Sequence, residues 1–94
     1  MTAQTISAIH AQQDAFVQQV VTHHRAGDHY PDPWIIGQEL RFTHTQTEGV
    51  LRALRAIGWI AASPYGPERL RLTPRCWGEL RREVASPAPS RHAA

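Results

Sequence analysis

The sequence predicts a mainly helical fold with one small β-hairpin. Four stretches place apolar residues at helical spacing, and two short stretches between the third and fourth alternate apolar and polar residues. The 94 residues are 41% apolar and 19% charged, which is typical of a globular domain with one hydrophobic core. We expect one domain over residues 1–85 and a disordered tail over residues 86–94, where nearly nothing can be buried.

The first helix is predicted from Thr5 to about Ala26 and ends at Gly27. Its apolar positions are Ile6, Ile9, Phe16, Val17, Val20 and Val21. The remaining surface is rich in glutamine and nearly uncharged. This surface fits a helix covered by a second copy of the chain, and it fits equally well a helix with one face on its own core and the other in water.

A short second helix is predicted from Trp34 to about Leu40, because Asp32 can cap it and Pro33 suits the first helical position. Its inward residues are expected to be Trp34, Ile36 and Leu40. Gly37 in the middle of this helix costs about 1 kcal/mol relative to alanine, so we expect close packing to require it.

Thr43 is the predicted cap of a third helix, which runs from His44 to about Ile57 and ends at Gly58. Its buried positions are expected to be Thr47, Val50, Leu51, Leu54 and Ile57. Strands are predicted over residues 59–63 and 69–72, with the turn-rich residues 64–68 between them.

The last helix is predicted to begin after Thr73, which offers a cap just before Pro74, and to reach about Ala85. Its apolar side carries Trp77, Leu80 and Val84. Cys76 is the only cysteine, so an intrachain disulfide is impossible, and we expect half-buried packing for it in a reducing cytoplasm.

Residues 34–80 resemble a winged helix-turn-helix domain, and residues 36–60 look like the core of MarR-type and related bacterial regulators. The residues that carry this resemblance are Gly37, Phe42, Thr43, Leu51, Leu54, Gly58, Trp59, Ile60, Leu72 and Thr73. The resemblance implies a DNA-binding surface made by helix 44–57 and a wing over residues 59–72. It does not imply the MarR ligand pocket, because this chain is shorter and has only one helix after the wing.

A helix that enters the major groove must show short polar side chains opposite its core leucines. The residues expected on that face are His44, Thr45, Gln46, Glu48, Gly49 and Arg52, next to the cap Thr43. Arg52 can fork onto guanine, Gln46 can pair with adenine, and Thr45 can meet a phosphate or a thymine methyl group. Glu48 either accepts from cytosine or only orients Arg52. Gly49 either lets the backbone approach DNA closely or is a tolerated glycine.

In the wing, Arg69 and Arg71 should point to the same side, while the leucines beside them face the core. Together with Tyr65, these arginines can follow a phosphate ridge or reach into a minor groove. Arg41 and Arg55 flank the motif and are expected to contact phosphates.

Other classes of protein have little support in the sequence. The six histidines do not show the spacing of a metal site, and the motifs of phosphate loops, zinc hydrolases and serine nucleophiles do not occur. We therefore expect no catalysis, no metal and no cofactor, and nothing indicates a small-molecule ligand. The N-terminus lacks the pattern of a secretory signal, and no stretch is long enough to span a membrane, so a cytoplasmic protein is expected.

The expected function is sequence-specific binding of double-stranded DNA by a homodimer that forms through the first helix, as in a transcriptional repressor. The net charge of +2 with an isoelectric point near 9.3 is compatible with this partner. Two alternatives stay open. The first alternative is an adaptor that binds proteins. The second is a protein that binds DNA for plasmid partition, replication or phage recombination.

Overall fold

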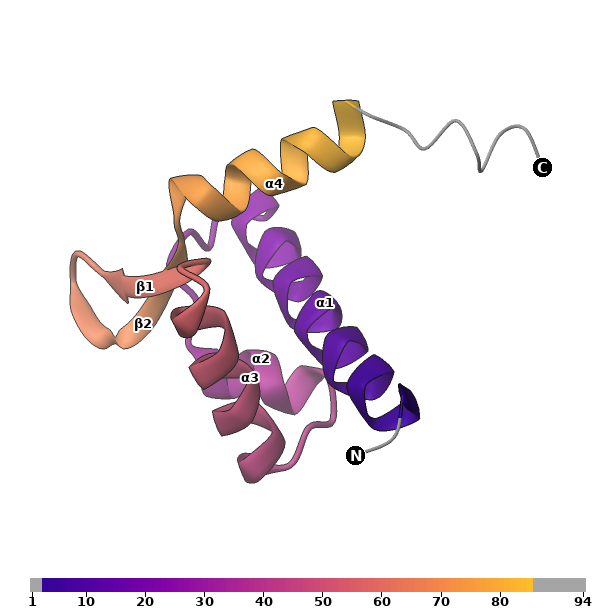
Figure 1. Ribbon diagram of the computed structural model, residues 1–94. Coiled ribbons are helices and arrows are strands. Elements are labelled where there is room, and N and C mark those ends of the chain that lie inside the picture. Colours follow the sequence, from indigo (N-terminus) through magenta and orange to yellow (C-terminus); the bar gives the residue numbers. More distant parts are fainter. Residues whose placement is uncertain (1–2, 86–94) are drawn as a thin grey trace.

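The computed structural model describes the backbone of residues 3–85 and the side chains of residues 10–82. Within this range the chain is mainly helical with one antiparallel two-stranded hairpin (Figure 1). The elements in order are α1 (Ala3–Arg25), α2 (Pro33–Glu39), α3 (His44–Ala56), β1 (Ile60–Ser63), β2 (Gly66–Leu72) and α4 (Pro74–Ala85). The predicted tail over residues 86–94 and the side chains of Ile6, Ile9 and Val84 lie outside the described part.

The four helices and the hairpin share one hydrophobic core. The long helix α1 packs against α2 and α3, β1 packs against α3, and β2 contacts both α2 and α4. Figure 1 shows α4 crossing the C-terminal end of α1 and the hairpin projecting beside α3. The most deeply buried side chains are those of Phe16, Val20, Ile36, Leu54, Leu70 and Cys76. None of the described helices is long and apolar enough to cross a membrane.

The helix starts follow the predicted capping pattern. The Asp32 carboxylate accepts a hydrogen bond from the backbone N–H of Trp34 at 2.9 Å, and Pro33 is the first residue of α2. The Thr73 hydroxyl accepts from the N–H of Cys76 at 3.3 Å at the start of α4. These caps satisfy backbone donors that the first turn leaves without partners, so both predicted starts are confirmed.

The ends of α1, α2 and α3 share one hydrogen-bond pattern, in which the chain turns back through a residue with positive φ. This residue is Gly27 after α1, with φ of 99°, and Gly58 after α3, with φ of 76°. After α2 it is Arg41, the only described residue other than glycine with a positive φ, which is 61°. The closing bonds run from the N–H of Asp28, Phe42 and Trp59 to the carbonyls of His23, Gly37 and Leu54, each at 2.9 Å.

Gly37 allows α2 and α3 to approach each other closely. A Cβ atom at this position would collide with Oγ1 of Thr47, which is buried on the facing side of α3 and donates a hydrogen bond to the carbonyl of Thr43 at 3.1 Å. The predicted packing reason for this glycine is therefore confirmed.

The hairpin is longer than predicted, because β2 begins at Gly66 rather than at Arg69. Ile60 pairs with Leu72 and Ala62 with Leu70, but Ser63 pairs with Gly66, so the register shifts next to the turn. Gly66 has φ of 150°, and the Ser63 hydroxyl bridges the turn by accepting from the N–H of Tyr65 at 3.1 Å.

Three predictions of burial are wrong. Trp34 is 38% exposed, because two helical residues are separated by about 200° and Trp34 therefore cannot share a face with the buried Ile36. Ile57 is 42% exposed, because it is the C-cap of α3 and lies where the chain leaves the helix. Cys76 is fully buried instead of half-buried.

Candidate functional site

Helix α3 presents a polar face to the surface, opposite the side that packs on the core. Thr47, Val50, Leu51 and Leu54 are buried, as the helical spacing predicted. The exposed residues of the helix and its cap that were predicted to contact DNA are Thr43, His44, Thr45, Gln46, Glu48, Gly49, Arg52 and Arg55. Arg41 is exposed as well, in the turn between α2 and α3.

Two recesses divide this polar face. One, of about 350 Å³, lies between α3 and the hairpin. It is lined by Pro33, Trp34, Glu48, Leu51, Arg52, Arg55, Pro67 and Glu68. The other lies between α3 and α1, and its α3 residues are Thr45, Gln46, Gly49 and Val50. The candidate contacts of α3 therefore fall into a group beside the hairpin and a group beside α1.

Arg52 and Arg55 are available for an external partner. Neither guanidinium forms an ion pair or a hydrogen bond within residues 10–82, although Glu48 and Glu68 line the same recess. Glu48 instead lies next to His44, with its carboxylate 3.7 Å from Nε2 of that ring. The structure thus favours neither of the two predicted roles of Glu48 and adds His44 as its neighbour.

Trp34 belongs to this surface, although the sequence analysis placed it in the core. Its indole stacks on the imidazole of His44, with ring centroids 4.5 Å apart and an interplanar angle of 2°. The stack connects the first turn of α2 to the first turn of α3. The helical angle between Trp34 and Ile36 was the signal in the sequence that could have revealed the exposure of Trp34.

Gln46 takes part in the cap of α3. Its side-chain oxygen accepts from the N–H of Thr43 at 2.8 Å, and the Thr43 hydroxyl accepts from the N–H of Gln46 at 3.1 Å. A bidentate contact with adenine uses both the oxygen and the nitrogen of a glutamine side chain, so such a contact competes with the capping bond for the orientation of the Gln46 side chain. The threonine followed three residues later by glutamine was a capping signal that the sequence analysis overlooked.

Gly49 lies open at the surface. A Cβ atom at this position would meet no atom of a neighbouring element within 4 Å. The fold therefore does not require a glycine here, in contrast to Gly37.

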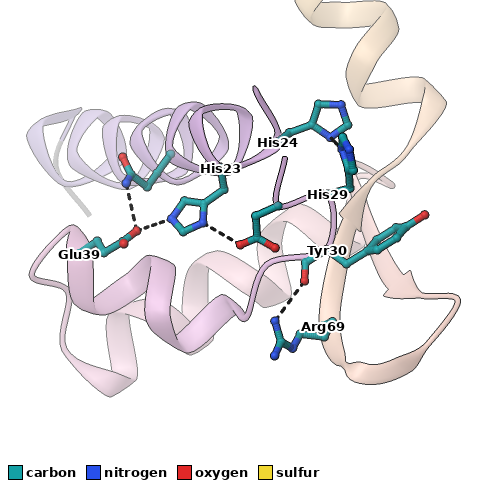
Figure 2. Close-up of polar contacts among 8 residues, drawn as sticks. His23, His24, His29, Tyr30, Glu39 and Arg69 are labelled. Atoms are coloured by element: carbon teal, nitrogen blue, oxygen red, sulfur yellow. Dashed lines mark hydrogen bonds and ion pairs between the residues drawn. The ribbon is translucent and has the colours of Figure 1, made fainter. Parts of the chain in front are cut away.

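The two arginines of the hairpin each donate a hydrogen bond to a backbone carbonyl group of the protein. Nη1 of Arg69 donates to the carbonyl of Tyr30 at 3.5 Å (Figure 2), and Nε of Arg71 donates to the carbonyl of Ala62 at 3.2 Å. Tyr65 at the hairpin turn is 81% exposed and its ring lies 5.4 Å from that of Tyr30. Leu70 and Leu72 beside these arginines are buried, as predicted, but Pro67 and Glu68 are the hairpin residues that line the recess with Arg52.

A histidine bridges the end of α1 to the end of α2, and nothing in the local sequence indicated it. Nδ1 of His23 lies 2.9 Å from the Asp28 carboxylate, and Nε2 lies 2.6 Å from that of Glu39 (Figure 2). Hydrogen bonds to Asp28 and then to Glu39 raise the pKa of His23, and the bonds from His23 and then from Gln19 lower the pKa of Glu39. Two carboxylate acceptors require both ring nitrogens to donate, so His23 is cationic in this arrangement.

The buried thiol and the histidines do not form a reactive or metal-binding group in the described part of the chain. Burial raises the pKa of Cys76 to about 11, so this thiol stays protonated near neutral pH. Within the side chains that the structure describes, no three His, Cys, Asp or Glu residues come together as metal ligands.

Comparisons of the chain with models of known protein families, with curated proteins and with solved structures found no match.

Proposed function

We propose that this chain is a winged helix-turn-helix domain that binds double-stranded DNA. The observation that carries the proposal is the exposed polar face of α3, where Arg52 and Arg55 have no partner within residues 10–82 and lie beside a β-hairpin. A guanidinium without an internal partner can fork onto guanine or phosphate without first breaking a contact in the protein.

The order of the elements supports the fold part of this proposal. The chain contains, in order, a helix, a close-packed pair of helices, a hairpin and a last helix. The segment before α2 also runs along the hairpin, since the N–H of Leu70 donates to the carbonyl of Pro31 at 3.1 Å. The hairpin is thereby tied to the helix pair, as a wing beside a recognition helix must be if both are to contact one duplex.

In this proposal, α3 lies in the major groove and Arg52 reads a base. Thr45, about two helical turns before Arg52 and in the group beside α1, meets a phosphate or a thymine methyl group. Arg55 and Arg41, at the two sides of the motif, contact phosphates. Tyr65, Arg69 and Arg71 of the hairpin follow the backbone or enter the minor groove. Arg69 and Arg71 each donate one N–H to a carbonyl group of the protein and have further N–H groups for phosphates.

The domain acts as a homodimer on an inverted repeat, with α1 as the contact between copies, and it represses transcription without catalysing a reaction. A role in plasmid partition, replication or recombination uses the same contacts. The glutamine-rich surface of α1 supports the choice of this helix, because α3 and the hairpin are occupied by DNA in the proposed complex.

A protein adaptor is the second candidate, and one observation favours it. Trp34 and Ile35 on α2 are 38% and 46% exposed, and the recess beside Trp34 holds two carboxylates as well as two guanidinium groups. A near-neutral recess with an exposed tryptophan suits a peptide at least as well as it suits a polyanion.

The test is selection of bound sequences from a randomised duplex pool at physiological salt, with the mass of the free protein measured by light scattering. The proposal expects an inverted repeat with half-sites about one helical turn apart and a dimer mass. Arg81→Ala is the matched control for Arg52→Ala, because Arg81 is an exposed arginine on α4, away from α3. Binding without sequence enrichment, or enrichment that Arg52→Ala leaves unchanged, contradicts the proposed reading of DNA by α3.

A further inference from the structure

Helix α2 holds the imidazole of His44 in place before any partner binds. The ring lies parallel to the indole of Trp34, with centroids 4.5 Å apart and an interplanar angle of 2°. Trp34 is itself fixed, because its backbone N–H donates to the Asp32 carboxylate at 2.9 Å in the first turn of α2. The stack therefore selects one orientation for a side chain that would otherwise sample several rotamers.

The edge of the His44 ring stays open to solvent. The side chain is 73% exposed, so the indole covers one face and leaves the ring nitrogens accessible. Within residues 10–82 neither nitrogen forms a hydrogen bond, and the 3.7 Å between Nε2 and the Glu48 carboxylate is too long for one. A protonated imidazole carries an N–H at both nitrogens, so it can donate to an external oxygen.

The surroundings of this ring act on a positive charge in opposite directions. The face of Trp34 attracts a cation, and the Glu48 carboxylate supplies a counter-charge. The start of α3 opposes them, because the helix dipole repels a cation at the first helical residue. Other charged side chains exposed around this motif are Arg41, Arg52, Arg55 and Glu68. A phosphate at the open edge of the ring adds a further negative charge and favours the protonated form.

Glu48 makes a neutral His44 unfavourable in the proposed DNA complex. It is the only acidic residue of α3, and it is exposed on the face proposed to meet DNA. Beside a neutral imidazole, its carboxylate adds an uncompensated negative charge next to phosphates. A protonated imidazole at 3.7 Å offsets this charge and also donates a charge-assisted hydrogen bond to a phosphate.

We propose that Trp34 is a positioning residue of the DNA interface, which holds His44 as a phosphate contact, and that His44 makes this contact in its protonated form. DNA binding then takes up a proton at His44 in each copy of the chain, and binding strengthens as the pH falls. This inference rests on the proposed function. It adds a dependence on pH that the arginine contacts do not have, because an arginine stays charged throughout.

The test compares the affinity of the full chain for a duplex recovered from the selection, at about pH 8 and about pH 6 and at constant ionic strength. For the unmodified chain we expect at least about five-fold tighter binding at the lower pH. The slope of log K against log salt should also be steeper there, by about one unit for each copy bound.

His44→Gln keeps a polar side chain that cannot titrate, so it should lose most of this gain and leave the affinity at the higher pH nearly unchanged. His29→Gln is the matched control and should keep the gain. It removes an exposed histidine in the loop between α1 and α2, where His29 pairs with His24 rather than with α3.

Trp34→Ala should reduce the gain in affinity at the lower pH, because the imidazole loses its stacked face, whereas Trp34→Phe keeps a ring and should retain part of it. An equal loss at both pH values in Trp34→Ala contradicts the positioning role of Trp34. A gain that persists in His44→Gln, or that disappears in His29→Gln, overturns the inference while the proposed function stands. A chain that binds no duplex at either pH overturns both.

Discussion

Replacement of Arg41 by glycine should stabilise the fold and weaken DNA binding at the same time. Arg41 has a φ of 61° at a helix end where the two equivalent positions, Gly27 and Gly58, hold glycine. The left-handed conformation costs an L-residue about 1–2 kcal/mol. The Arg41 side chain makes no hydrogen bond or ion pair within residues 10–82, so the fold loses no contact when it is removed.

The expected gain is smaller than this strain, because glycine also makes the unfolded chain more flexible. That effect costs roughly 0.4–1 kcal/mol, which leaves a net stabilisation of about 0.5–1 kcal/mol. For a domain of this size the melting temperature should rise by about 3–6 °C. Thermal unfolding followed by circular dichroism measures this change directly.

DNA binding should change in the opposite direction. If Arg41 contacts a phosphate, Arg41→Gly should weaken binding to all sequences alike and reduce the slope of log K against log salt by about one unit. Arg41→Ala is the matched control, because it removes the same charge and keeps the strain, so its affinity should fall equally while its melting temperature stays unchanged. An unchanged melting temperature for Arg41→Gly refutes the strain argument, and an unchanged salt slope refutes the phosphate contact.

The remaining predictions concern two glycines, the histidine bridge and the arginines of the proposed interface. Gly37→Ala should lower stability by at least about 1 kcal/mol in denaturant unfolding, because its Cβ meets Thr47, whereas Gly49→Ala should raise it by about 0.5–1 kcal/mol. If the Gly49→Ala variant binds DNA normally, close backbone approach at this glycine is ruled out. The raised pKa of His23 means that its bridge stabilises the fold fully below about pH 6.5 and that this contribution is lost as pH rises through the folded-state pKa. In the His23→Gln variant, the free energy of unfolding should no longer decline through this bridge as the pH rises above about 6.5. A decline of the same size in the variant would contradict the assignment to His23. Arg52→Ala should cost about 1–3 kcal/mol of specific binding and relax one base position in a site-variant panel, while Arg69→Ala should lower affinity for all sequences and reduce the salt slope by about one unit. Equal losses on every site variant would make Arg52 a phosphate contact, and an unchanged slope for Arg69→Ala would remove the hairpin from the interface.

Most of the fold could be predicted because the signals are local. Asp32, Thr43 and Thr73 cap helices through hydrogen bonds that reach only two or three residues along the chain. Gly27 and Gly58 end helices through their own backbone conformation. The buried face of α3 follows from helical spacing alone, so the sequence contains enough information to place it.

The features that the sequence did not reveal depend on contacts between distant residues. His23 and Glu39 are sixteen positions apart, and their contact exists only because α2 packs against the end of α1. The stack of Trp34 on His44 likewise depends on how α2 and α3 pack, whereas the exposure of Trp34 follows from its helical separation from Ile36 and could have been predicted. The bulge beside Ser63 is an exception, because it follows from local side-chain bonds within the turn. The alternation of apolar and polar residues does not encode these bonds.

The small net positive charge around α3 explains why the proposed DNA complex needs two copies of the chain. Arg52 and Arg55 share their recess with Glu48 and Glu68, so this part of the surface contributes little net positive charge. Affinity for DNA arises mainly from neutralised phosphates, and strong binders make about six to ten such contacts. One copy offers Arg41, Arg55 and the two hairpin arginines for this purpose, which is fewer than six contacts. A single domain should therefore bind weakly at physiological salt, whereas two copies on an inverted repeat add their phosphate contacts within one complex.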